Sequence, residues 1–592
     1  MKKVDNILKI LFDSGVLLIG FIVANVILSN ILFLLGIHIS VINFWASLLV
    51  VLMIFLVVGK NKDKVYLNKI ASIGIFLVIL FSSIFVASRI YDSSYDGNSY
   101  HKGAIGLMAH GWNPVYQTAE DFSDGLFKIR GAKIFTWIDH YQNLSWIFGA
   151  SIYRVFGNIE TAKSINYLLI CGIFLILINY FKRLKFKHLQ SVILSFVTVF
   201  SPVVLAQIFS FYIDGNLAIT FYLYIATISL LIVELVKTNK LSKELILILF
   251  ASICILINLK LTGLLLAGVG ILPFAIYLTI LAIKKTVKTS NYLILVSAFM
   301  TSILVAILLV GSTTYVKNAL TMHNPFYPLL GDNRSDIITT MQPRELMDKN
   351  QFEKLLISIF SRSENTQYYS IKPLEFKLPL TWNDAELVNL NITDTRIGGF
   401  GLFFSFLFLL SLGILCYYLI EAYRKKQTGA LNLKLQRNIV VCILAGITLY
   451  ILLPTENWWA RYAPNIYLLV PLALATLFIK INQAPNKNLL RVVATVCLLA
   501  VVLNQLPFVS FRMRGLKENR MAKSELDVAK EYMDINPNTT VIINDYYMGV
   551  YFNLLDKKII KEGTKFEFLK RAIDREALAR YKHNSFYGRV LY

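Results

Sequence analysis

The sequence predicts an all-α polytopic membrane protein of about 13 transmembrane helices, with long loops on one side and a small C-terminal α/β segment. Three observations support this fold class. Of the 592 residues, 56% are hydrophobic and only 16% are charged. The mean hydropathy is +0.59. Apolar runs of about 20 residues, the length that crosses a bilayer, recur along the chain. A soluble protein of this size needs more charge on its surface.

Each predicted span is an apolar run without a charged centre. The first run is too long for a signal peptide and lacks a small-residue cleavage site, so it is an ordinary span. The predicted spans are 11–35, 41–59, 68–90, 161–181, 189–207, 215–236, 244–259, 262–283, 291–313, 399–420, 438–453, 463–480 and 490–508.

Clusters of Lys and Arg between the spans set the orientation. They alternate with the predicted spans and place the N-terminus in the cytoplasm and the C-terminus outside, by the positive-inside rule. The apolar run 142–157 is therefore predicted to be an interfacial or re-entrant helix, because counting it would move the cluster 182–187 outside. The outer side then carries loops 91–160 and 314–398 and the tail 509–592.

The tail alternates in character. Residues 521–535 are predicted to form a helix, 540–543 a strand and 565–582 a charged helix. The result is a small extracytoplasmic α/β segment.

Composition also limits the partners. The net charge of +23 is explained by loop Lys and Arg under the positive-inside rule, so we expect a lipid bilayer and no nucleic acid as partner. All five Cys fall inside apolar runs, which predicts neither disulfides nor a thiolate metal site.

The most informative stretch is Ser88–Tyr116, where two acids follow the end of an apolar run. Asp92 and Asp96 are four residues apart, and Asp96 precedes an amphipathic run from Tyr100 to His110. Asp96 fits a helix N-cap. It also fits a general base at the membrane surface, because an alcohol acceptor needs a group to take its proton. The two interpretations are compatible.

Further charged residues lie in short outer turns. Asp214 is the acid of the connection between the fifth and sixth spans, where it caps a helix or acts with Asp96. Lys260, Arg396 and Arg461 are cations where the positive-inside rule disfavours them. A lipid phosphate would account for them, since Arg binds phosphate bidentately and Lys as a point charge. Snorkelling to headgroups is the alternative.

Histidines and aromatic residues complete the candidate site. His101, His110 and His140 share the first outer loop with the acids. A divalent metal site is left open there, although no tight spacing of ligands supports it, and the alternative is a hydrogen bond from His101 to a leaving phosphate. Aromatic candidates for stacking on a sugar or acceptor lie near the predicted outer interface, where an aromatic belt is the alternative. They are Tyr100, Trp112, Tyr212, Trp458 and Trp459.

In combination these features resemble the C-type (GT-C) membrane glycosyltransferases, which include protein O-mannosyltransferases, aminoarabinose transferases and bacterial oligosaccharyltransferases. The resemblance rests on Asp96 and the run after it, on the segment from Trp146 to Gly157, on Asp214, and on a soluble segment after the last span. It divides the chain into an N-terminal two-span addition (1–67), a GT-C-like core (68–508) and the extracytoplasmic segment (509–592). The Trp-Trp-Asp-Tyr-Gly motif of oligosaccharyltransferases is absent, which points away from transfer of a whole oligosaccharide to protein.

The resemblance implies a bacterial cytoplasmic-membrane enzyme that moves a single sugar from a polyprenyl phosphate to an envelope glycan or lipid acceptor, with inversion. Asp96 would be the base, and Lys260 or Arg461 would meet the lipid phosphate. Asp92 or Asp214 would orient the acceptor or bind a metal; Mg or Mn is left open and no other cofactor is expected. Two alternatives stay open, an O-antigen-type polymerase or ligase and a non-enzymatic lipid or glycan transporter.

Overall fold

The computed structural model describes residues 2–57, 63–127, 134–331, 334–335, 341–364, 373–424, 431–483, 487–535, 541–544, 547–561, 566–569 and 590–591. Within this part of the chain, ten helices are long and apolar enough to cross a membrane. The protein is thus an integral, multi-pass membrane protein. The ten spans are Val4–Leu34, Tyr66–Ser88, Ile159–Arg183, Asp214–Thr238, Leu261–Ile283, Thr289–Val310, Phe404–Arg424, Leu433–Leu452, Pro464–Gln483 and Asn488–Met513.

The other three predicted spans are shorter helices. They are α2 (Val41–Val57), α12 (Lys243–Leu259), and α9 (His188–Val199) followed by α10 (Pro202–Gln207). The run 189–207 is broken because Pro202 disfavours helical geometry in the preceding residue, and Ser201 instead caps α10. The sequence prediction of about 13 full-length spans therefore exceeds the ten that helix length supports.

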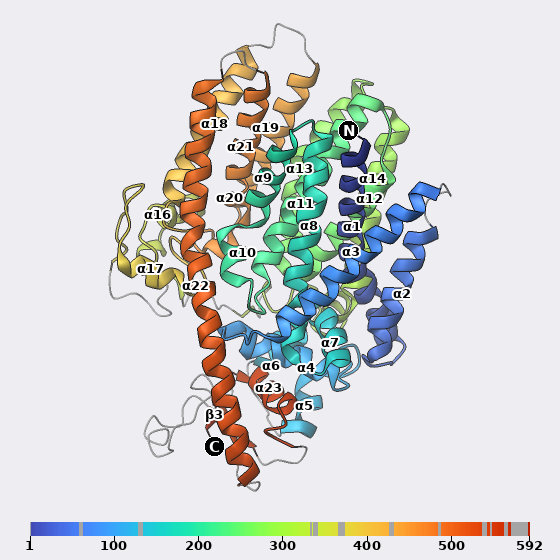
Figure 1. Cartoon of the computed structure of the whole chain (residues 1–592), viewed down its shortest axis with the longest axis vertical. Helices are drawn as coiled ribbons and strands as arrows, with labels where there is room; N and C mark the ends of the chain where they lie inside the picture. Colours follow the sequence, from blue (N-terminus) through green and yellow to red (C-terminus); the bar gives the residue numbers. More distant parts are fainter. Residues whose placement is uncertain are drawn as a thin grey trace.

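The membrane part is a bundle with α11 (Asp214–Thr238) at its centre (Figure 1). Twenty of the 25 residues of α11 are buried. It contacts α12 and the helices α8 (Ser164–Arg183), α13 (Leu261–Ile283), α19 (Leu431–Leu452) and α20 (Pro464–Tyr467). The bundle also contains α1 (Lys2–Leu34), α3 (Asp63–Ser88), α14 (Thr289–Val305), α18 (Phe404–Arg424) and α21 (Leu469–Gln483).

Two glycines allow α1 and α8 to cross closely. A Cβ on Gly15 would come within 2.7 Å of the Gly172 carbonyl oxygen. Small residues of this kind let helix backbones approach each other in membranes, where packing drives association.

The first long loop folds into short helices at one end of the bundle, which we call the site end. They are η1 (Gly97–His101), α4 (Lys102–Ala109), α5 (Ala119–Phe127), α6 (Ile134–His140), α7 (Leu144–Phe156) and η2 (Ile159–Lys163). With 13 residues, α7 is too short to span. The run after Asp96 is less amphipathic than its sequence suggests, because every residue of α4 is buried.

The span that starts with α14 continues through η3 (Ala306–Val310), and η4 (Ser312–Val316) leads from it into the second long loop. This loop then contains α15 (Lys317–Thr321), η6 (Arg344–Leu346), α16 (Gln351–Ile359) and α17 (Asp384–Leu390). A short turn, η8 (Ala460–Tyr462), joins α19 to α20.

One helix of 48 residues, α22 (Asn488–Ile535), replaces the separate span and tail helix that the sequence predicted. It crosses the bundle and extends past it at the lower end of Figure 1. The predicted strand at 540–543 overlaps β1 (Val541–Asn544), which pairs in parallel with β2 (Phe566–Leu569) and antiparallel with β3 (Val590–Leu591). The predicted charged helix at 565–582 is wrong at its start, which is β2, and residues 570–589 lie outside the described part.

Between the first two strands, α23 (Gly549–Asp556) packs against α4, η1 and η2 at the site end. The C-terminal segment thus contacts the first long loop directly, which matters for the site described next.

Candidate functional site

Charged side chains from five distant stretches meet at the site end of the bundle. Asp96 directly precedes η1, and Asp214 is the first residue of α11. Lys260 separates α12 from α13, Asp394 precedes α18, and Arg461 lies in η8. All five are joined by ion pairs.

Arg461 is the centre of this group. Its Nη1 lies 2.9 Å from Asp96 Oδ2 and 3.3 Å from Asp214 Oδ2. Its Nε lies 2.9 Å from Asp394 Oδ1, an ion pair without hydrogen-bond alignment. The guanidinium also lies 4.7 Å from the centroid of the Trp459 ring, within the range of a cation–π contact. A planar guanidinium with several donors can hold more than one carboxylate in this way, which an ammonium group cannot do as well.

Lys260 completes the group from the other side. Its Nζ lies 2.6 Å from Asp214 Oδ1 and 3.8 Å from the centroid of the Tyr462 ring. The backbone of Lys260 is extended, which breaks the helical run and turns the side chain to the site. Asp214 also accepts a hydrogen bond of 3.2 Å from Gln207 Nε2. Its place in the first turn of α11 favours the ionised carboxylate through the helix dipole.

Arg396 lies at the edge of the group and pairs with Asp394 at 2.9 Å. Trp459 Nε1 donates to Asp394 at 2.8 Å, and Arg396 lies over the Trp459 ring at 4.6 Å. Asp394 was not among the sequence candidates. The signal that could have found it is its position two residues before Arg396 in a loop that was already of interest.

Formal charges balance in this site, since three carboxylates face three cations. Burial raises the pKa of the Asp96 carboxyl, while Arg461 acts in the opposite direction. Burial alone would lower the pKa of Arg461, but Asp394, Tyr462 and the two other carboxylates raise it well above its usual value. Asp96 is thus a carboxylate of increased basicity beside a permanent cation, and this arrangement suits proton transfer next to a bound anion.

Two sequence interpretations of the acids need correction. Asp96 has helical backbone angles and makes no side-chain capping bond, because Arg461 takes its carboxylate. Asp92 does not join the Arg461 group. Its oxygens accept hydrogen bonds from Ser94 N at 2.8 Å, Ser94 Oγ at 2.7 Å and Phe211 N at 3.0 Å. Asp92 therefore holds the loop, and the predicted catalytic role for it has no support in the geometry.

The three histidines do not converge. Trp146 Nε1 donates to His101 Nδ1 at 2.7 Å, and burial lowers the pKa of His101 to about 3, which keeps the ring neutral. His110 and His140 bond elsewhere, to Gly106 O and to Asn318 Oδ1. In the described ranges, no three His, Cys, Asp or Glu side chains are grouped as metal ligands would be. Among the described residues, His101, His110 and His140 thus do not come together as ligands of one metal.

The aromatic candidates separate into two sets. The Arg461 guanidinium lies 5.0 Å from the centroid of the Tyr212 ring. The rings of Tyr100 and His101 pack together with 4.3 Å between their centroids. Trp458 and Trp459 stack on each other and are only 1% and 2% exposed, so neither presents a free face to a sugar. Trp112 is buried and donates to Gln117 O in its own loop. Sugar stacking on these three indoles is therefore not supported.

Sequence comparisons give no relative. No protein-family model matches the chain, and no curated protein matches it. Among solved structures, the chain is similar to the crystal structure of ArnT from Cupriavidus metallidurans bound to undecaprenyl phosphate, with a TM-score of 0.38 and 12% identity. The match covers 83% of this chain and 89% of the other.

Proposed function

We propose that the protein is a membrane glycosyltransferase that moves a single sugar from a polyprenyl-phosphate donor to an envelope glycan or a lipid-linked acceptor. The observation that carries the proposal is the contact between Asp96 and Arg461, with Lys260 and Asp214 beside it, where the apolar helices end. A buried base and two buried cations at the end of membrane spans suit a reaction on a phosphate whose lipid lies in the bilayer. The site would face the outer side of a bacterial cytoplasmic membrane.

In this proposal, Arg461 and Lys260 bind the donor phosphate. Both are less than a tenth exposed, so water screens their charge weakly. Both are already paired with carboxylates, so the phosphate competes with Asp96 and Asp214 for them. Arg396, which shares Asp394 with Arg461, adds positive potential at the edge.

Asp96 then accepts the proton of the acceptor hydroxyl. The acceptor oxygen forms a bond to the anomeric carbon on the face opposite the phosphate, and the bond from that carbon to the phosphate oxygen breaks. The lipid phosphate leaves with the electron pair, and the sugar is inverted. The added negative charge on the leaving phosphate is stabilised by the two cations, which act as preorganised electrostatic catalysts. Asp214 keeps Lys260 in place and orients the acceptor.

The test is Asp96→Asn in purified protein reconstituted with lipid-linked sugar donors. Asparagine keeps the shape and an acceptor oxygen for Arg461 but cannot take a proton. We expect transfer to fall by roughly 10²- to 10⁴-fold, the usual contribution of a general base. Asp121→Asn is the control, because Asp121 is exposed and its hydrogen bonds within the described ranges are with Thr118.

The same variants are examined in cells by analysis of the envelope glycan. We expect a deletion strain and the Asp96→Asn strain to lack the same sugar. Transfer by Asp96→Asn within threefold of the wild type would show that Asp96 is not the base. Movement of the lipid-linked sugar across vesicles without transfer would favour the transporter alternative.

A further inference from the structure

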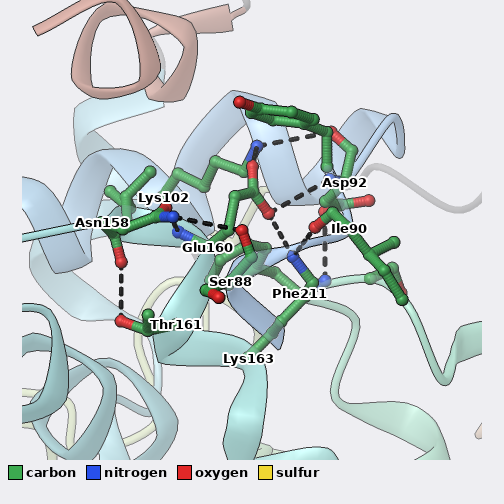
Figure 2. Close-up of polar contacts among 12 residues, drawn as sticks. Ser88, Ile90, Asp92, Lys102, Asn158, Glu160, Thr161, Lys163 and Phe211 are labelled. Carbon is green, nitrogen blue, oxygen red and sulfur yellow. Dashed lines mark hydrogen bonds and ion pairs between the residues drawn. The ribbon is translucent and has the colours of Figure 1, made fainter. Parts of the chain in front are cut away.

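A second cluster of buried charges lies behind the Asp96 site. Glu160 Oε1 lies 2.5 Å from Lys102 Nζ, and Glu160 Oε2 is hydrogen-bonded to Lys163 Nζ. All three side chains are fully buried, at 0% exposure. Figure 2 shows Lys102 and Lys163 meeting at the one carboxylate of Glu160, with Asp92 and Phe211 to its right. We call Lys102, Glu160 and Lys163 the Glu160 cluster.

The cluster holds the segment that leads to Asp96. Glu160 Oε2 accepts a hydrogen bond from Asp92 N at 3.1 Å, and Lys102 Nζ donates to Asp92 O at 3.3 Å. Lys163 Nζ donates to Ile90 O. On the other side of Asp96, Lys102 Nζ donates to Asn98 Oδ1 at 3.1 Å. Asp96 therefore lies between two points that the cluster fixes.

The cluster also holds the segment that leads to Asp214. Both ammonium groups lie 5.5 Å from the centroid of the Phe211 ring, and Phe211 N donates to Asp92 Oδ2 at 3.0 Å. Phe211 is three residues before Asp214. The segments that carry Asp96 and Asp214 are thus tied to one another through Asp92, Phe211 and the cluster. Figure 2 shows Asp92, Phe211 and the cluster.

The C-terminal segment closes the cluster. Asn553 of α23 donates to Glu160 Oε1 at 2.9 Å and accepts from Lys102 Nζ at 3.1 Å. A Cβ on Gly106 would overlap the Phe552 ring, so α23 fits against α4 at glycine positions. Asp556 accepts from Ile159 N at 2.7 Å, next to Glu160. The Glu160 carboxylate is therefore hydrogen-bonded both to α23 and to the loop that carries Asp96.

Stability alone does not account for such a cluster. Apolar residues of similar volume often replace a buried ion pair with no loss of stability. What a buried charge cluster adds is a demand for one geometry, since each misplaced charge is costly. Here the partners of the cluster lie in the segments that lead to Asp96 and Asp214 and in α23.

We propose that Glu160 is a positioning residue, which sets the separation of Asp96 and Asp214 and links it to the docking of α23. Glu160 makes no contact with the Arg461 group among the described residues, so it acts through Asp92 and Phe211 and not on the substrate. The inference rests on the proposed function for its catalytic consequence, but not for its structural consequence.

The test compares Glu160→Gln with Glu160→Gln/Lys163→Met. The single variant leaves two buried cations without a carboxylate, whereas the double variant leaves one, Lys102, and so regains part of the lost stability. We expect Glu160→Gln to lower kcat by at least tenfold with the donor KM within threefold. We expect the double variant to unfold at a higher temperature than Glu160→Gln without recovering kcat. Glu421→Gln is the control. It removes the partner of buried Lys480, at 2.7 Å, in the last turn of α18 and far from Asp96.

Amide hydrogen exchange supplies a readout that needs no activity. In Glu160→Gln we expect exchange to increase at least tenfold in 92–101 and 208–214, and to stay unchanged there in Glu421→Gln. Equal exchange of these two segments in Glu160→Gln and Glu421→Gln would overturn the proposal. Recovery of kcat together with stability in Glu160→Gln/Lys163→Met would also overturn it. If the wild type transfers no sugar while the exchange pattern is as expected, the proposed function fails and the positioning by Glu160 stands.

Discussion

Arg461→Lys offers the sharpest measurement of the site. The wild-type guanidinium contacts Asp96 at 2.9 Å, Asp394 at 2.9 Å and Asp214 at 3.3 Å. Lysine keeps the charge, and with it the balance of three cations against three carboxylates, but it cannot hold the same set of partners. Loss of one hydrogen bond to a charged group costs about 1.5–3 kcal/mol. This corresponds to a decrease of roughly 10- to 100-fold in kcat/KM for the donor.

Arg461→Gln separates charge from geometry. It removes the cation and leaves the site with a net negative charge, which repels the donor phosphate, so we expect a larger decrease than in Arg461→Lys. The assay is transfer from a labelled lipid-linked sugar in proteoliposomes, with the donor concentration varied. Arg437→Lys is the matched control, because Arg437 is also 7% exposed and, among the described residues, contacts Asn438 and the Tyr423 ring and none of the Arg461 group. Activity of Arg461→Gln within threefold of the wild type would refute the phosphate role of Arg461.

Three further predictions follow from other parts of the structure. Lys260→Met should raise the donor KM about tenfold, the scale of one charge-assisted bond, in the same transfer assay. Gly106→Ala should destabilise the protein by about 1–3 kcal/mol in thermal unfolding in detergent, because the added methyl group overlaps the Phe552 ring, and Phe552→Leu should restore the stability of this variant. Gly74→Ala is the control, since its methyl group meets no atom within 4 Å and should leave the stability unchanged. Asp556→Asn should flatten the pH dependence of stability: burial raises the pKa of Asp556 from 3.8 to about 7, so its contribution is present below pH 3.8 and lost as the pH rises through 7. If the unfolding temperatures of the wild type and of Asp556→Asn fell equally from pH 5 to pH 8, this role of Asp556 would be contradicted.

The sequence indicated the membrane class and most members of the Arg461 group, for different physical reasons. Apolar length is a local property, so spans such as Asp214–Thr238 are visible without any tertiary information. Lys260 and Arg461 were identifiable because a cation in a short turn of the predicted outer side violates the positive-inside rule. That Asp96, Asp214 and Lys260 converge on one guanidinium depends on how the bundle packs, and no local pattern encodes it.

The sequence predictions that failed depended on tertiary contacts, which a local pattern does not show. Asp92 was given a supporting role because it lies four residues before Asp96, but Ser94 and Phe211 bind Asp92 in a loop. The buried indoles looked available because the sequence does not show what covers them. Glu160 and Lys163 are three residues apart at the start of an apolar run, and that placement was a usable signal of a buried pair.

Charge balance connects the two clusters to the chemistry that we propose. The Arg461 group is formally neutral without a donor, so a bound phosphate makes it negative. A negative charge beside a buried carboxylate raises its pKa further, so Asp96 becomes a stronger base when the donor is present. The two acids must then stay in place although the phosphate competes for the cation that joined them. The Glu160 cluster still holds the segments that carry both acids, through Asp92 and Phe211, and by this route we propose that a carboxylate without contact to substrate controls the rate.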